Sequence, residues 1–394
     1  MNKDLSKLLN QTAVNMKPSG IRRFFDIAQQ MEDVISLGVG EPDFKTPWKI
    51  RQTAIDTLQK GRTCYTANSG LKELRQEIAA YTKNTVHTDY DPNNEIIVTV
   101  GGSEAIDLTV RAIVSPGDEV LVVEPCFVCY SPIVSMAGGI PVSIETKVED
   151  EFRLTAEQLR EHITERTKLL ILPFPNNPTG AVMTREDLEA VAEVLRDTDI
   201  FVLSDEIYSE LTYSGKHCSI VELEGMRERT VLVNGFSKSF AMTGWRLGWA
   251  CAPHYIMQQM LKLHQYAIMS SPTTSQYAAI TALRDCLPDT VKMKNEYNIR
   301  RRFVVDGFNK LGLTCFEPQG AFYVFPCIRS TGMSSEEFCE KLVHSKRVAV
   351  VPGNAFGKSG EGFVRVSYAY SVAHLREALK RIGEFLEELN GERK

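Results

Sequence analysis

Five short apolar runs, rich in branched residues, recur through the middle of the chain and constrain its fold more than any other feature. They occupy residues 95–100, 119–123, 168–172, 200–203 and 230–233. Stretches with helical spacing of apolar residues lie between several of them, as in residues 185–195. Unbroken apolar runs are typical of strands buried on both faces, and their alternation with helices indicates a mostly parallel sheet with helices on each side. The sequence therefore predicts an α/β fold.

The last third of the chain has a different pattern. Shorter strand-like runs occupy residues 322–325, 348–351 and 363–367. A closing amphipathic helix is expected to end near Asn390 and Gly391, where glycine would form the C-cap. A chain of 394 residues has room for two domains.

We therefore expect a second, smaller α+β domain. The predicted division has three parts, which are residues 1–47 as an N-terminal arm and part of the small domain, 48–290 as the large domain, and 291–394 as the small C-terminal domain.

Composition argues against several classes of function. The chain has 45 basic and 50 acidic residues, a net charge of −5, which does not favour nucleic acid or an anionic membrane as a partner. The N-terminus lacks the apolar stretch of a signal peptide, and no apolar run reaches membrane-spanning length. The nine cysteines are scattered and odd in number, so we expect no disulfide framework and a reducing, cytoplasmic location.

Metal binding is also disfavoured. Cys126 and Cys129 have the spacing of a redox or zinc pair, but no second pair accompanies them. The seven histidines show no metal-ligand spacing. We therefore expect no metal site.

Unusual residues follow each predicted strand of the large domain, and ligands of parallel α/β sheets bind beyond the carboxyl ends of the strands. After the first strand, Gly102 and Ser103 lead into a helix whose N-terminus could bind a phosphate, although most such turns bind nothing. After the second, Phe127 could stack on a flat ring or could simply pack in the core. After the third, Asn177 could donate to a phenolate oxygen and to a carboxylate.

Asp205 directly follows the fourth apolar run. A carboxylate at such a buried position requires a cationic partner, and a protonated pyridine nitrogen would serve. The alternative is an ordinary helix N-cap. Tyr208, three residues later, would share a helical face with Asp205 if a helix begins here.

Lys238 follows the fifth run, among small and apolar residues of the segment 235–248. Desolvation favours the neutral amine, and a neutral amine can form a Schiff base with an aldehyde cofactor. Arg246 lies on a Gly-Trp-Arg-Leu-Gly turn and could hold a phosphate through paired hydrogen bonds. Taken alone, the segment also allows a solvated surface lysine. Together with the four other strand ends it suggests pyridoxal 5′-phosphate (PLP).

Residues 235–248 resemble the lysine signature of the class I aminotransferases, the aspartate aminotransferase family of fold-type I PLP enzymes. Residues 36–44, 177–180 and 204–208 resemble the bacterial gamma subgroup of that family. The resemblance extends over nearly the whole chain, from about Ser19 to the C-terminal helix. It implies a fold-type I PLP-dependent transferase, with a mostly parallel central sheet in a large PLP-binding domain and a smaller α+β domain.

The resemblance also implies roles for individual residues. Lys238 would carry the Schiff base and act as the catalytic base, Asp205 would pair with the pyridine nitrogen, and Tyr208 and Asn177 would contact the ring oxygen. Phe127 would stack on the ring. The residues expected around the phosphate are Gly102, Ser103, Ser237 and Arg246.

Substrate binding and assembly are implied in the same way. Arg365 would grip the substrate α-carboxylate, with Gly40 and Asn177 nearby, although from the sequence alone it is a strand arginine with a surface role by default. Tyr65 would reach into the phosphate site of a neighbouring subunit. This implies a homodimer with shared active sites.

The expected reaction is ping-pong transfer of an amino group through pyridoxamine phosphate. The donor would be an L-amino acid (aspartate, alanine or aromatic), and the acceptor a 2-oxo acid such as 2-oxoglutarate. N-acetyl-diaminopimelate is used by similar enzymes. Some gamma-subgroup aspartate aminotransferases have a lysine where this chain has Ser103, so a charge partner for aspartate is not evident. Arg22 or Arg23, in a segment expected to cover the pocket, could supply the charge or could be solvated.

Two other classes are compatible with the same fold, since fold does not determine reaction. A carbon–sulfur β-lyase of the cystathionine type would release pyruvate and ammonia. A non-catalytic regulator that binds the cofactor would normally carry an N-terminal DNA-binding domain, for which we expect no room before Ser19.

Overall fold

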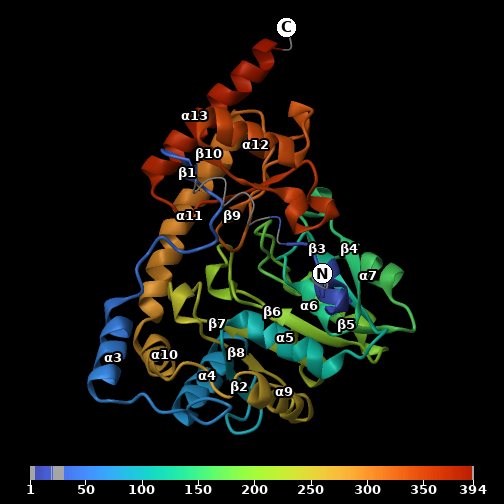
Figure 1. The fold of residues 1–394 in the computed structure, drawn as a ribbon, viewed down its shortest axis with the longest axis vertical. Helices are drawn as coiled ribbons and strands as arrows, with labels where there is room; N and C mark the ends of the chain where they lie inside the picture. The colour runs from blue at the N-terminus through green and yellow to red at the C-terminus, as the bar shows by residue number, and fades with distance from the viewer. Residues whose placement is uncertain (1–4, 19, 21–30, 393–394) are drawn as a thin grey trace.

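A seven-stranded sheet forms the centre of the molecule (Figure 1). The computed structural model describes residues 5–18, 20 and 31–392. The strand order across the sheet is β2-β8-β7-β6-β5-β3-β4. In chain order the strands are β2 (Ile96–Thr99), β3 (Glu119–Glu124), β4 (Ile140–Glu145), β5 (Thr167–Leu172), β6 (Phe201–Asp205), β7 (Thr230–Gly235) and β8 (Gly248–Cys251).

Burial on both faces explains the unbroken apolar runs. In β5, Leu169 and Ile171 join one core cluster while Leu170 and Leu172 join another, as the two-residue period of a strand requires. The helices that pack into the first cluster are α5 (Gly102–Ile113), α6 (Tyr130–Met136) and α9 (His254–Ala267). The helices on the other face are α3 (Trp48–Gln59), α4 (Lys72–Thr85), α7 (Ala156–His162), α8 (Arg185–Arg196) and α10 (Thr273–Asp285).

Local sequence determines where the predicted helix α8 begins. The Thr184 side chain accepts a hydrogen bond from the Asp187 backbone, and the Asp187 carboxylate accepts one from the Thr184 backbone. This capping box satisfies two backbone donors that a helix start leaves unpaired. The helix expected over residues 185–195 is thereby confirmed.

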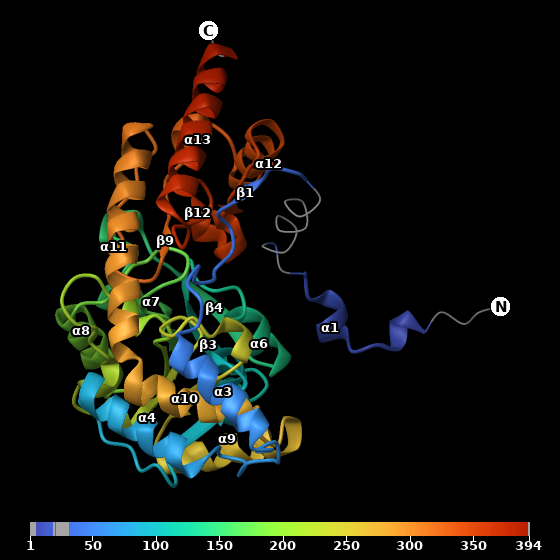
Figure 2. The ribbon, with the colours of Figure 1, turned by 90° about the vertical axis from the view of Figure 1, so that its left-hand side faces the viewer.

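The C-terminal part of the chain forms two smaller sheets. Strands β11 (Val351–Pro352), β12 (Val364–Ser367) and β9 (Tyr323–Val324) form an antiparallel sheet, and β1 (Ile35–Ser36) pairs in parallel with β10 (Val348–Ala349). The helices here are α12 (Ser335–Lys346) and α13 (Val372–Glu392). The long helix α11 (Leu287–Lys310) lies beside α13 at one end and α10 at the other (Figure 2). A short helix, α1 (Gln11–Asn15), precedes β1.

Two features differ from the sequence predictions, and the predicted domain division is not tested. Strands β4 and β8 were not expected, and β8 is antiparallel to both of its neighbours. The closing helix continues through Asn390 and Gly391 to Glu392, so the predicted C-cap at Gly391 is wrong. The predicted boundary at residue 290 falls in the first turn of α11, and the three-part division of the chain stays a prediction. Within the described ranges, no helix is long and apolar enough to cross a membrane.

Close backbone contact between β8 and the start of α5 generates a stability prediction. A methyl group at Gly248 would lie 2.6 Å from the carbonyl carbon of Gly101 and 2.6 Å from the nitrogen of Gly102. Both contacts are with backbone, which cannot rotate away. We expect Gly248→Ala to lower the free energy of unfolding by about 1–3 kcal/mol, measured as a lower thermal midpoint.

Gly391→Ala is the matched control. A methyl group there meets no atom within 4 Å, and the residue is helical. Its thermal midpoint should stay the same or rise. Equal midpoints for Gly248→Ala and wild type would contradict the packing argument.

Candidate active site

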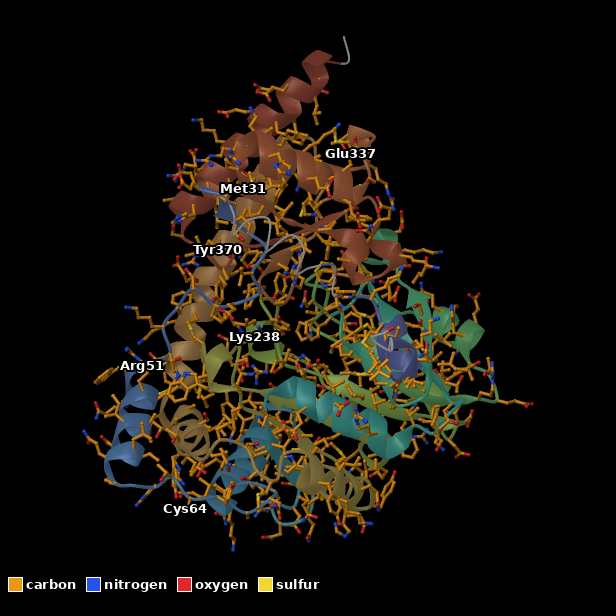
Figure 3. The ribbon with its side chains drawn as sticks, viewed as in Figure 1. Met31, Arg51, Cys64, Lys238, Glu337 and Tyr370 are labelled. Atoms are coloured by element: carbon orange, nitrogen blue, oxygen red, sulfur yellow. The ribbon has the colours of Figure 1, made fainter. Side chains whose placement is uncertain are left out.

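A cavity of about 410 Å³ opens at the carboxyl ends of the parallel strands. Its walls come from the central sheet, the segment after β1 and the C-terminal strands, and Lys238 lies near the middle of the molecule (Figure 3). The sequence-predicted residues that line it are Gly40, Gly102, Ser103, Phe127, Asn177, Asp205, Tyr208, Ser237, Lys238, Arg246 and Arg365. The volume falls within the usual range for small-molecule sites, about 300–1,000 Å³.

Lys238 presents its amine to this cavity. Its Nζ donates a hydrogen bond to the carbonyl oxygen of Gly40 at 2.6 Å, and lies 5.8 Å from the ring centres of Tyr208 and Phe322. Desolvation lowers the pKa of Lys238 to about 8, against a partial opposing effect of the Glu41 carboxylate. About a tenth of the amine is therefore neutral and nucleophilic at pH 7, far more than for an ordinary lysine.

Asp205 ends β6 and is 7% exposed. Its Oδ2 accepts a hydrogen bond from the Tyr130 hydroxyl at 2.7 Å, and its Oδ1 accepts one from the Ile207 backbone at 3.2 Å. Desolvation raises the pKa of Asp205 to about 6, partly offset by the Tyr130 hydrogen bond. Of the basic side chains that the structure describes, none forms an ion pair with this carboxylate.

The chain after Asp205 differs from both local expectations. No α-helix begins here, so the helix N-cap alternative for Asp205 is wrong. A turn follows instead, and Tyr208 precedes the short 3-10 helix η3 (Ser209–Leu211). The predicted shared helical face is therefore also wrong, although both side chains line the cavity.

The start of α5 lies among groups that could hold an anion. Gly101, with φ of 76°, turns the chain into the helix, which begins at Gly102. The Arg246 guanidinium packs against Gly101 so closely that a methyl group on Gly101 would lie 2.7 Å from Nη2. Ser103 and Ser237 also line this side. Backbone N–H groups of a helix start, a guanidinium and hydroxyl groups suit a phosphate dianion.

Arg365 occupies another wall and is 3% exposed. Its Nη1 donates to Asn177 Oδ1 at 2.9 Å, and its Nη2 donates to the carbonyl of Gly38. The guanidinium lies between two aromatic rings, 4.5 Å from the centre of Tyr323 and 4.7 Å from that of Phe356. Its Nε has no hydrogen-bond partner.

Arg365 also forms no ion pair with any acidic side chain in the described part of the chain. A buried cation of this kind is suited to an anionic ligand. The default surface role that the sequence alone assigned to Arg365 is wrong.

Two tyrosines of the site, Tyr130 and Tyr323, were not predicted from the sequence. Tyr130 holds Asp205, and Tyr323 forms a 2.9 Å hydroxyl–hydroxyl hydrogen bond with Tyr208. Tyr323 also requires glycine at position 40, because a methyl group there would lie 2.4 Å from its hydroxyl oxygen. Tyr130 lay in a strand-end segment that the sequence had marked, whereas Tyr323 gave no signal beyond a buried strand.

Tyr65 is the predicted site residue that the structure places elsewhere on this chain. It is 80% exposed and does not line the cavity. Arg22 and Arg23 lie outside the described residues. Across residues 5–18, 20 and 31–392, no three His, Cys, Asp or Glu side chains are grouped so that they could hold a metal ion.

Comparisons with known proteins show the family to which this chain belongs. The family model for aminotransferase class I and II matches residues 32–382. The chain is 48% identical to an aspartate aminotransferase of Pyrococcus abyssi over 95% of this chain and 97% of that protein. It is 45% identical to an aromatic-amino-acid aminotransferase of Thermococcus litoralis over 95% of this chain and 97% of that protein.

The solved structures are similar in the same way. The aromatic aminotransferase of Pyrococcus horikoshii superposes with a TM-score of 0.89 at 46% identity, covering 93% of this chain and 99% of that one. These matches confirm the fold-type I architecture and the resemblance noted in the sequence. The chain belongs to the class I and II aminotransferase family, and it is a transaminase.

Proposed function

We propose that the cavity binds PLP and that this transaminase uses it to move an amino group between an L-amino acid and a 2-oxo acid. One observation carries the proposal: a neutralisable amine, an unpaired buried carboxylate and an anion site face one cavity of suitable size. These three groups are complementary to an aldehyde, a pyridinium nitrogen and a phosphate. The family membership supports the same cofactor.

The described residues fit PLP in specific ways. The start of α5, Ser103, Ser237 and Arg246 would hold the phosphate. Asp205 would gain the cationic partner that it lacks, and Phe127 would cover the ring. Asn177 and Tyr208 would donate to the ring oxygen.

The side chains that line the cavity then have distinct roles in the reaction. When bound, PLP supplies an aldehyde for Schiff-base exchange and a ring that accepts electron density. With its amine free, Lys238 would take the proton from the substrate α-carbon and would return a proton to the former aldehyde carbon of the cofactor. Asp205 keeps the ring nitrogen protonated, and Arg365 with Asn177 orients the substrate through its carboxylate.

The substrate side chain would meet a largely apolar surface. The cavity walls include Val39, Ile106 and Pro175, and beyond Lys238, Arg246 and Arg365 no described cation lines it. The relatives include an aspartate and an aromatic-amino-acid aminotransferase. We propose aspartate, alanine or aromatic amino acids as donors and 2-oxoglutarate as an acceptor. No feature of the described cavity favours the β-lyase.

Assembly and location belong to the same proposal. The exposed Tyr65 side chain is free to reach a second subunit, which supports a homodimer with shared active sites. All nine cysteines are described and are free thiols, which supports a reducing, cytoplasmic environment. We also propose the division into residues 1–47, 48–290 and 291–394, with PLP held mainly by the second part.

The pKa of Lys238 generates a test of this function. Cofactor-free protein should capture PLP through the neutral amine, so the capture rate should rise about tenfold per pH unit up to about pH 8 and then level off. Growth of the visible absorbance band measures the rate. Lys238→Ala should keep the wild-type circular dichroism spectrum but lose the band and nearly all turnover.

Lys380→Ala is the control, because that lysine is largely exposed on α13. It should behave as wild type. Near-normal turnover of Lys238→Ala, or a capture rate that does not change between pH 6 and 9, would show that Lys238 is not the residue that captures PLP.

The environment of Arg365 generates a second test. Arg365→Lys keeps a positive charge but loses the planar fork that pairs with carboxylates. We expect kcat/KM for amino acids to fall on the order of a hundredfold. Arg329→Lys is the matched control, since Arg329 also stacks on an aromatic ring but does not line the cavity.

A donor amine without a carboxylate should react equally slowly with Arg365→Lys and with wild type. If Arg365→Lys and Arg329→Lys have the same kcat/KM for amino acids, Arg365 does not bind the substrate carboxylate.

A further inference from the structure

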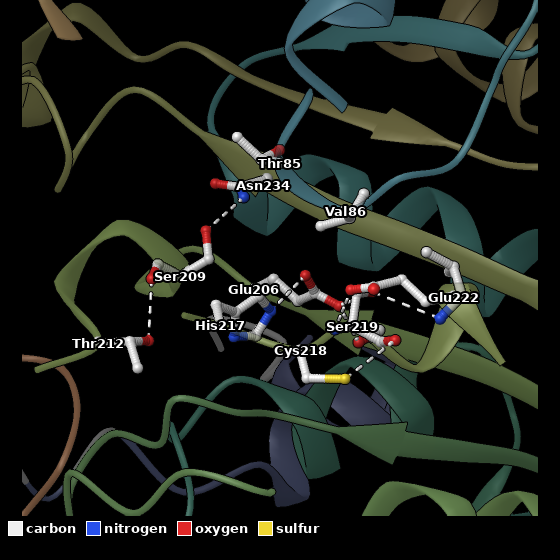
Figure 4. Close-up of polar contacts among 12 residues, drawn as sticks. Thr85, Val86, Glu206, Ser209, Thr212, His217, Cys218, Ser219, Glu222 and Asn234 are labelled. Atoms are coloured by element: carbon white, nitrogen blue, oxygen red, sulfur yellow. Dashed lines mark hydrogen bonds and ion pairs between the residues drawn. The ribbon is translucent and has the colours of Figure 1, made fainter. Parts of the chain in front are cut away.

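Glu206 lies next to Asp205 in sequence but lines a different cavity from the proposed cofactor site. Its carboxylate lies beside His217 and Ser219 (Figure 4). It is 1% exposed. A carboxylate so completely removed from water is costly unless donors and a cation compensate it. The partners of this carboxylate show which segments of the chain it connects.

Three side chains satisfy this carboxylate. Oε1 accepts hydrogen bonds from Ser204 Oγ at 2.8 Å and from Ser219 Oγ at 2.5 Å. Oε2 pairs with Nε2 of His217 at 2.6 Å. Ser204 belongs to β6, whereas His217 and Ser219 belong to the loop that precedes the 3-10 helix η4 (Ile220–Glu222). The carboxylate therefore connects the end of β6 to the loop that contains His217 and Ser219.

The charges that face His217 favour its protonated form. Burial lowers the pKa of His217, but the Glu206 carboxylate, with smaller effects of Glu222 and Glu210, raises it more, and the net pKa is above its ordinary value. Lys216 and Lys294 line the small cavity next to the pair. The pair is thus a buried carboxylate hydrogen-bonded to an imidazole whose protonated form that carboxylate favours.

The same turn carries the groups that face the cofactor. The Glu206 backbone N–H donates to the carbonyl of Val233 at 2.9 Å, extending the pairing of β6 with β7. Asn234 Nδ2 donates to Ser209 Oγ at 3.0 Å and fixes the far end of the turn. Asp205 and Tyr208 lie within this anchored stretch and point into the proposed cofactor site.

We propose that Glu206 and His217 are positioning residues, whose buried hydrogen-bonded pair holds the turn that presents Asp205 and Tyr208 to the cofactor. The proposal rests on the proposed function of the cavity. It extends the site to side chains that do not line the cofactor cavity. A displacement of about 1 Å at reacting groups can cost on the order of a hundredfold in rate.

The test compares wild type with Glu206→Gln, His217→Gln and the double variant. Absorbance titration of cofactor-free protein measures the dissociation constant for PLP, and the pH midpoint of the visible band reports the surroundings of the bound ring. Each single variant should weaken PLP binding about tenfold, shift that midpoint, and lower kcat more than it raises KM. The double variant should lose no more than the worse single variant, because the two residues act as a unit.

Glu119→Gln is the matched control. Glu119 is also a buried carboxylate of the central sheet, paired with Arg166 and Thr164, but it lies at the opposite end of the strands, where β3 begins. Its substitution should lower the thermal midpoint and leave the dissociation constant and the pH midpoint at their wild-type values.

The outcomes separate the two proposals. If the Glu206 and His217 variants lower only the thermal midpoint, as Glu119→Gln does, the pair is purely structural and the positioning proposal is overturned. Additive losses in the double variant would also overturn it. If the single variants fail to fold, the double variant, which leaves no unpaired charge, provides the test. A dissociation constant for PLP equal to that of wild type would then overturn the proposal. If wild type itself captures no PLP, the proposed function fails and this proposal fails with it.

Discussion

Desolvation of one amine and one carboxylate at the carboxyl edge of the sheet is the constraint on which the rest of the site depends. Removal from water lowers the pKa of Lys238 to about 8 and raises that of Asp205 to about 6. Desolvation thereby disfavours the charged form of both groups. It makes the amine of Lys238 a better nucleophile, and it leaves the carboxylate of Asp205 in need of a cationic partner. A single physical cause prepares both for a ligand that carries an aldehyde and a basic ring nitrogen.

The fold supplies that desolvation by converging distant segments on one edge. Asn177 and Lys238 lie on the segments that follow the parallel strands β5 and β7, and Asp205 is the last residue of β6. The C-terminal strands β9 and β12 contribute Tyr323 and Arg365. Glycine at positions 40 and 101 leaves room for the side chains of Tyr323 and Arg246, and glycine at position 248 lets β8 approach the backbone at the start of α5. The site is therefore a property of several elements together, and no local segment contains it.

The sequence predicted the parts of this arrangement that depend on local pattern. Apolar runs buried on both faces revealed five strands of the central sheet, and the parallel-sheet rule marked the segments that hold Asp205 and Lys238. The structure departs from prediction where long-range packing decides. Strand β8 has a short mixed sequence and pairs only because β2 and β7 flank it.

Tertiary context also governs the side chains that the sequence misjudged. Tyr208 lies in a turn and not in a helix. Hydrogen bonds from Glu206 to Val233 and from Asn234 to Ser209 hold this part of the chain against the neighbouring strand. Arg365 is an ordinary strand arginine by sequence, and only the folded chain surrounds it with Tyr323, Phe356 and Asn177. The network of Glu206 and His217 likewise depends on a loop whose sequence carries no chemical pattern.

Transfer of an amino group through PLP bound at Lys238 can be followed in the absorbance spectrum of the PLP-loaded protein as single amino acids are added without any 2-oxo acid. We expect loss of the visible band, growth of the band of the amine form of the cofactor, and release of a stoichiometric amount of 2-oxo acid. A visible band that persists while pyruvate and ammonia accumulate from cystathionine or cysteine would contradict this expectation, as would the absence of any visible band after PLP is supplied.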